Sequence, residues 1–185
     1  DARADGTFRV DVYLNNIRKA SHLSAQLTTL DGVKVGTPVN QVIPKGAAKV
    51  QLKTVAPQIK PWNPEFPNLY QVTVTLHEDG EPLHQITERF GFRTVELRER
   101  DGIYVNGVKI KFKGVCRHSF WPTTGRTLNK QQSIRDVLLM KEMNMNAVRM
   151  SHYPPDTHFL DVCDSLGLFV LDELAGWQTR YDTEI

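Results

Sequence analysis

The chain has 185 residues and a mass of 21.1 kDa, which suits one large domain or two small ones and is short for a complete eight-stranded α/β barrel. With 40% hydrophobic and 24% charged residues, its composition is that of a globular protein that can bury a core. The net charge of +2 indicates no nucleic-acid or membrane partner, and no apolar stretch is long enough to span a bilayer. Two cysteines, Cys116 and Cys163, exclude a disulfide framework, and we expect both to be buried.

Residues 1–97 predict an immunoglobulin-like β-sandwich. Short runs alternate apolar and polar residues, turn residues such as Asp31 and Gly32 separate the runs, and no run has helical spacing. The Pro-rich segment 57–70 must follow an edge or a corner of the sandwich, because proline cannot donate to a sheet ladder. The alternating apolar positions are Phe8, Val10, Val12, Leu14, Leu23, Ala25, Leu27, Val50, Leu52, Tyr70, Val72, Val74, Leu76, Ile86, Phe90 and Phe92.

The pattern changes after residue 97. An Asn-Gly pair at 106–107 lies between apolar residues, which is the strongest short signal of a β-hairpin. The residues that follow, 109–115, predict a strand. Asn129 with Gln132 three positions later resembles a capping box, so we expect a helix over 130–144.

The remaining residues predict a strand at 146–150, a helix that starts at Pro155 and stops at Gly167, and a strand at 168–171. The order strand, helix, strand, helix, strand implies right-handed crossovers and parallel strands. Three such strands leave edges unpaired, so we expect residues 98–185 to be the opening part of a larger α/β unit.

Ligands bind parallel α/β units at the carboxyl ends of the strands, and all three predicted strands end in polar or aromatic residues. These candidates for substrate binding are His118, Arg149, His152, Asp172, Glu173 and Trp177. Each has a structural alternative: the histidines can be ordinary loop residues, and Trp177 and Trp121 can pack on neighbours. For Arg149 we expect an ion pair with Asp172 or Glu173, since a charge inside a strand needs a partner.

Other chemistry has little support in the sequence. Asp172 and Glu173 are adjacent in a strand, so they point to opposite sides and cannot form a pair of catalytic carboxylates. His118 and His152 lack a third metal ligand, and no phosphate-binding loop, GxSxG or HExxH motif occurs. The sequence therefore predicts no metal and no cofactor.

Three segments carry a family resemblance: residues 61–76, 90–122 and 136–173. In this order they resemble the join between the immunoglobulin-like sandwich and the barrel in glycoside hydrolase family 2, which includes β-galactosidases, β-glucuronidases and β-mannosidases. The resemblance implies a retaining glycosidase with a (β/α)8 barrel and two catalytic glutamates. In the family these glutamates lie at the fourth and seventh barrel strands. Glu173 and Glu184 match neither position, so the resemblance implies that this chain carries no catalytic residue.

Carried over to this sequence, the resemblance implies that His118, Arg149 and His152 line the sugar subsite and that Asp172 and Glu173 are the family's Asp-Glu pair. The sequence departs from the family in two places. Cys116 stands where many relatives have Asn. The residues after the Asp-Glu pair lack the Glu and His that bind a metal in the β-galactosidase type, so a magnesium site is not implied.

The sequence thus predicts a fragment of a β-glycosidase whose longer parent acts on a carbohydrate, with self-association or domain exchange where barrel strands are open. The alternative is a noncatalytic carbohydrate-binding or structural sandwich followed by a linker. Amphipathic helices and buried strands over 130–171 argue against a linker.

Overall fold

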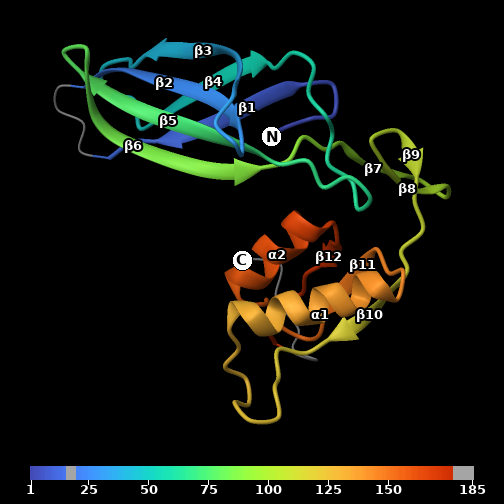
Figure 1. Cartoon of the computed structure of the whole chain (residues 1–185). Helices are drawn as coiled ribbons and strands as arrows, with labels where there is room; N and C mark the ends of the chain where they lie inside the picture. The colour runs from blue at the N-terminus through green and yellow to red at the C-terminus, as the bar shows by residue number, and fades with distance from the viewer. Residues whose placement is uncertain (16–19, 177–185) are drawn as a thin grey trace. The chain divides into compact units, whose positions relative to one another are not determined.

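The computed structural model describes residues 1–15 and 20–176, which form two compact units (Figure 1). The sandwich unit comprises Asp1–Asn63 and Asn68–Lys109, and the α/β unit comprises Pro64–Pro67 and the chain from Ile110 onward.

The sandwich unit contains a two-stranded and a four-stranded antiparallel sheet, as the alternating pattern predicted. The Pro-rich residues 57–69 form no strand. One strand, β3, was not predicted, because most of its side chains are exposed and leave no alternating apolar pattern. The sheets are β1 (Thr7–Tyr13) with β4 (Lys49–Val55), and, in spatial order, β3 (Lys34–Val42), β2 (Ala20–Thr29), β5 (Tyr70–Glu78) and β6 (Glu81–Phe90).

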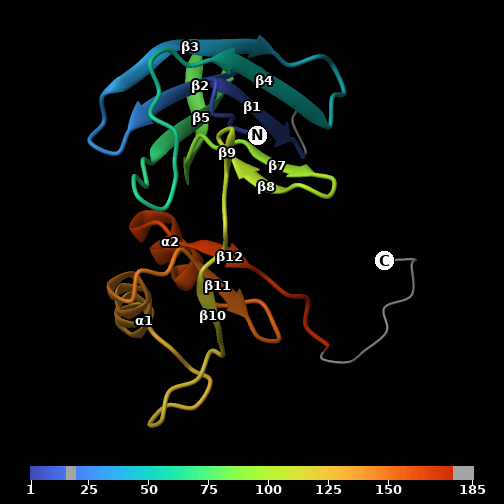
Figure 2. The same ribbon diagram turned by 90° about the vertical axis from the view of Figure 1, so that its right-hand side faces the viewer.

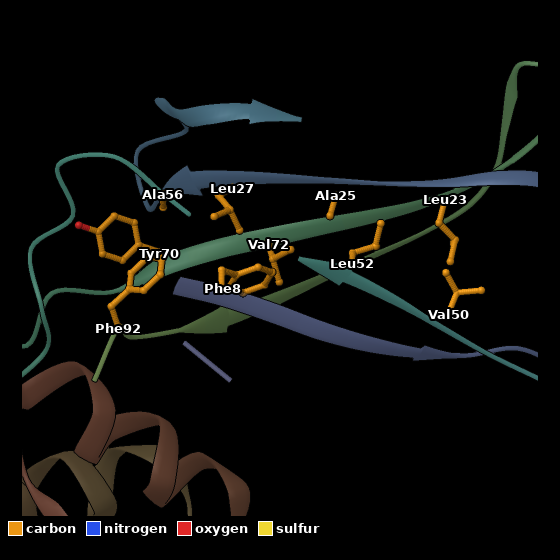
Figure 3. Packing of buried hydrophobic residues seen from close by; sticks show 10 residues of the cluster. All are labelled: Phe8, Leu23, Ala25, Leu27, Val50, Leu52, Ala56, Tyr70, Val72 and Phe92. Atoms are coloured by element: carbon orange, nitrogen blue, oxygen red, sulfur yellow. The ribbon is translucent and has the colours of Figure 1, made fainter. Parts of the chain in front are cut away.

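The core of the sandwich unit lies between its two sheets (Figure 3). Alternate residues of β2 and β4 are buried, so each strand turns one face inward. Phe92 is fully buried, and its ring meets Tyr70 edge-on with 5.2 Å between centroids. The ten buried residues of this core are Phe8, Leu23, Ala25, Leu27, Val50, Leu52, Ala56, Tyr70, Val72 and Phe92.

A small three-stranded sheet completes the sandwich unit and contains the predicted hairpin. Its strands are β7 (Val95–Arg98), β8 (Gly102–Val105) and β9 (Val108–Lys109). Asn106 and Gly107 connect β8 to β9 with φ of 51° and 79°, the left-handed values that a two-residue turn of this type requires.

The α/β unit is a parallel sheet with two helices, as predicted. The sheet has the order β10 (Gly114–Arg117), β11 (Ala147–Met150), β12 (Phe169–Leu171). Helices α1 (Lys130–Glu142) and α2 (Thr157–Leu166) lie on the same side of it (Figure 2). Neither helix is long and apolar enough to cross a membrane. The core between helices and sheet consists of Val137, Met140, Val148, Met150, Phe159, Val162, Cys163 and Leu168.

The helix ends follow their local signals, with one exception. The capping box at α1 is present, since Asn129 Oδ1 accepts from the Gln132 amide at 3.0 Å and Gln132 Oε1 accepts from the Asn129 amide at 2.8 Å. Gly167 ends α2 with φ of 78°. The prediction that Pro155 starts α2 was wrong: Asp156 has an extended backbone, so the helix begins at Thr157.

The strand predicted over residues 109–115 is present only in part, since β10 covers Gly114–Arg117. Residues 110–113 separate β9 from β10. The side chain of Asn146, instead of a neighbouring strand, forms hydrogen bonds with two of their backbone groups. It accepts from the Lys113 amide at 2.8 Å and donates to the Lys111 carbonyl at 3.0 Å. Strand β10 begins at Gly114, where a Cβ would lie 1.9 Å from the carbonyl oxygen of Ala147 and prevent the close pairing with β11.

Candidate functional site

The parallel sheet has a face toward the helices and a face away from them. Cys116, Arg149 and Leu171 are in register across the three strands. In the next row Arg117 pairs with Met150, which lies in the core beneath the helices. Because side chains alternate along a strand, the row of Cys116, Arg149 and Leu171 faces away from the helices.

Four polar side chains meet at the carboxyl ends of the strands, and we call Arg149, His152, Glu173 and His118 the strand-end cluster. The Arg149 guanidinium forms an ion pair with Glu173 Oε1, and His152 Nδ1 lies 3.1 Å from Glu173 Oε2. A carboxylate only accepts hydrogen bonds, so Nδ1 of His152 carries the proton. His118 meets His152 edge-on with 5.4 Å between ring centroids. Glu173 therefore fixes both a cation and an imidazole.

Arg149 makes further contacts on the same face of the sheet. Its Nη1 atom lies 3.4 Å from the sulfur of Cys116 and 3.5 Å from Oγ of the buried Ser151. The hydrogen bond from Arg149, followed by that from Ser151, lowers the pKa of the Cys116 thiol. The contacts with Cys116 and Glu173 raise the pKa of Arg149, which stays charged.

The aromatic ring of Tyr153 and a second arginine, Arg126, lie next to the strand-end cluster. The Tyr153 ring lies 6.2 Å from that of His118. The guanidinium carbon of Arg126 lies 4.0 Å from the centroid of the Tyr153 ring, within the range of a cation–π contact. The loop between β10 and α1 thus supplies Arg126 beside the loop that follows β11.

Behind the cluster, a buried arginine anchors the end of β10. Arg117 Nε donates to Asp136 Oδ2 at 2.8 Å, and its guanidinium lies 4.0 Å from the Phe159 ring centroid. Its Nη1 atom lies 3.4 Å from Ser119 Oγ. The residue before His118 is therefore tied to both α1 and α2, which restricts the position of His118.

The structure brings together four of the six predicted site residues. Of the two expected ion pairs of Arg149, that with Glu173 is confirmed. Asp172 lies apart: its side chain is exposed, and its Oδ1 accepts from the amide of Glu173 at 2.9 Å. Trp177 lies outside the described residues.

Two other expectations concern residues near the cluster. Cys163 is buried as predicted, but Cys116 is exposed, because it lies on the sheet face opposite the helices. Trp121 is half-buried, with the Arg135 guanidinium 5.5 Å from its ring centroid, so it packs on a neighbouring side chain. In the described part of the chain, no three His, Cys, Asp or Glu residues gather as a metal ion would require.

Comparison with known proteins identifies the family. Residues 1–93 match the family model of glycosyl hydrolases family 2, and residues 95–181 match that of the TIM barrel domain of the same family. The chain belongs to glycosyl hydrolases family 2. Its α/β unit is the first part of the family's TIM barrel.

Relatives of family 2 that resemble the chain are much longer than it. The chain is 39% identical over 136 residues to a β-galactosidase of Thermoanaerobacter pseudethanolicus. The matched region covers 70% of the chain and 18% of that protein. The chain is 35% identical over 165 residues to a putative β-glucuronidase of Formosa agariphila. The matched region covers 88% of the chain and 20% of that protein. The chain thus spans about a fifth of the length of these curated relatives.

Solved structures of the family share the fold. A family 2 member from Bacteroides cellulosilyticus superposes with a TM-score of 0.80 at 27% identity, over 94% of this chain and 25% of that one. A β-glucuronidase of Bifidobacterium dentium complexed with coumarin-3-O-glucuronide superposes with a TM-score of 0.77 at 27% identity, over 83% of this chain and 25% of that one.

Sequence reasoning missed three residues around the strand-end cluster of this family 2 chain. Ser151 and Tyr153 flank the candidate His152 in the sequence, so their neighbourhood was a usable signal. Arg126 follows Gly125 in a polar loop, and no local pattern distinguishes it from other surface arginines.

Proposed function

We propose that this chain is the part of a retaining β-glycosidase that supplies the sugar-binding wall of the active site, with both catalytic glutamates on later strands of the barrel. The observation that carries the proposal is the strand-end cluster, in which side chains from three consecutive parallel strands converge at the edge where barrel enzymes bind substrate.

Within the cluster, each residue has a distinct role. His118 and His152 bind sugar hydroxyls, and these hydrogen bonds strengthen as the oxocarbenium-like transition state forms. Glu173 is a positioning residue, since one carboxylate oxygen engages Arg149 and the other engages His152. Arg149 keeps its positive charge beside the sugar, and the exposed Asp172 lies at the rim of the site.

The substrate is a β-linked sugar of an oligosaccharide or polysaccharide. Similarity to proteins named β-galactosidase and β-glucuronidase supports two probes, the nitrophenyl β-D-galactoside and the nitrophenyl β-D-glucuronide. The isolated 185-residue chain should hydrolyse neither. The protein in which this chain continues into the rest of the barrel should hydrolyse at least one.

Substitution in that longer protein tests the role of the cluster. His152→Ala removes a hydrogen bond to the sugar, so kcat/KM should fall about tenfold to a hundredfold. His84→Ala is the matched control, because His84 is exposed on β6 of the sandwich unit. Turnover by the isolated chain that substitutions in it abolish would refute the proposal, as would full activity of the His152→Ala protein.

A further inference from the structure

Arg126 lies beside the strand-end cluster without being part of it. Its guanidinium contacts the face of Tyr153, whose ring in turn approaches His118. This cation–π contact uses none of the five guanidinium N–H donors as a conventional hydrogen bond, so they can bind a ligand. Arg126 is exposed, and among the residues that the structure describes no carboxylate pairs with it.

The loop that carries Arg126 is held in place by its own backbone. The Trp121 amide donates to the Gly125 carbonyl at 2.7 Å, and the Gly125 amide donates back to the Trp121 carbonyl at 2.8 Å. Gly125 has φ of 62°, which a residue with a side chain rarely adopts. This closed turn fixes the backbone immediately before Arg126, so the stacked arginine is positioned in advance of binding.

Arg149 and Arg126 differ in whether, among the described residues, a carboxylate pairs with the guanidinium. The charged Arg149 forms an ion pair with the Glu173 carboxylate inside the cluster. Arg126 keeps its positive charge at the outer side of the same strand ends. A planar guanidinium with available N–H groups binds an oxyanion with two parallel charge-assisted hydrogen bonds, which are stronger than the hydrogen bonds that the uncharged hydroxyls of a neutral sugar accept.

We infer that Arg126, held on Tyr153, is a specificity-determining residue that binds an oxyanion on the glycan next to the sugar in the strand-end cluster. The ligand class is an acidic glycan, in which the oxyanion is the carboxylate of a uronic acid or a sulfate ester. This inference rests on the proposed function, since it names the substrate class of the same site.

The test uses the protein in which this chain continues into the rest of the barrel. Three disaccharides share the terminal β-sugar that the enzyme hydrolyses and differ in the second sugar, which is a neutral hexose, a hexuronate or a hexose sulfate. Wild type should prefer at least one acidic disaccharide, and which of the two it prefers identifies the source of the oxyanion.

Arg126→Gln should reduce the ratio of kcat/KM for the acidic disaccharide to that for the neutral one by about tenfold, mainly through KM. Arg126→Lys keeps the charge but not the two parallel hydrogen bonds, so it should recover part of that ratio. Arg135→Gln is the matched control, because the Arg135 guanidinium also makes a cation–π contact but with Trp121, and this substitution should leave the ratio unchanged.

The outcomes separate the two proposals. Hydrolysis of all three disaccharides with a ratio that Arg126→Gln does not alter would overturn the inference while the proposed function stands. Absence of any hydrolysis by wild type would overturn the proposed function, and the inference with it.

Discussion

The two cysteines lie in different environments, which shift the pKa values of their thiols in opposite directions. Cys116 is exposed beside Arg149, whose hydrogen bond lowers the pKa of its thiol. Cys163 lies on the buried face of α2, where burial raises the pKa of its thiol to about 12. Thiolate is the reactive form, so the two positions should differ strongly in reactivity.

With iodoacetamide near neutral pH, Cys116 should be alkylated before Cys163, as peptide mass mapping of the native chain would show. Arg149→Gln removes the main cause of the lowered pKa, so less thiolate is present and alkylation of Cys116 should slow, whereas Cys163 should not change. Equal labelling rates of the two cysteines in the native chain would contradict this placement.

Sequence reasoning reached some residue contacts and not others for a physical reason. An ion pair of Arg149 with Asp172 or Glu173 was predicted because a charge inside a strand needs a partner, and the structure shows the pair with Glu173. The stack of Arg126 on Tyr153 depends on the conformations of two loops that are distant in sequence. No local pattern encodes such a contact.

Among the helices and strands, local sequence signals predicted the ends that depend only on backbone hydrogen bonds and backbone φ angles. The capping box at Asn129, the left-handed Gly167 and the Asn-Gly hairpin all lie where the sequence indicated. Two differences from prediction depend on tertiary structure. The Asn146 side chain replaces strand pairing for residues 110–113. Strand β3 has few buried side chains, so its sequence shows no alternating apolar pattern.

The connection of β10 to α1 and α2 depends on a buried charge. Arg117 is 7% exposed and pairs with Asp136, so Asp136→Ala leaves the arginine uncompensated and should lower the free energy of unfolding by about 3 kcal/mol. Urea denaturation followed by circular dichroism measures this loss.

Two variants control this prediction. Glu96→Ala breaks the exposed pair with Arg98, which solvent screens, so its loss of stability should be much smaller than that for Asp136→Ala. The double variant Arg117→Met with Asp136→Leu removes both charges and should recover most of the stability. A loss for Asp136→Ala no larger than that for Glu96→Ala would show that Arg117 does not anchor these elements.

At the scale of the whole molecule, the parallel sheet has two strands with an unpaired edge in the described part of the chain. Strands β10 and β12 each pair only with β11. Leu171 of β12 and Phe112, just before β10, are large apolar side chains that remain exposed. Open edges with apolar side chains favour pairing with another chain.

We therefore predict that the isolated 185-residue chain self-associates or exchanges barrel segments, which light scattering after size-exclusion chromatography would detect. Leu171→Lys places a charge on the β12 edge and should shift the population toward the monomer. A monodisperse monomer at all concentrations, with no effect of Leu171→Lys, would count against the prediction.

The central claim is that the strand ends of this chain hold the sugar whose bond is cleaved. The most direct measurement is a crystal structure of the longer protein with a bound β-glycoside or an inhibitor that mimics it. We expect His118 and His152 within hydrogen-bond distance of sugar hydroxyls, with the Arg149–Glu173 pair intact beside them. A sugar bound away from these residues would contradict it.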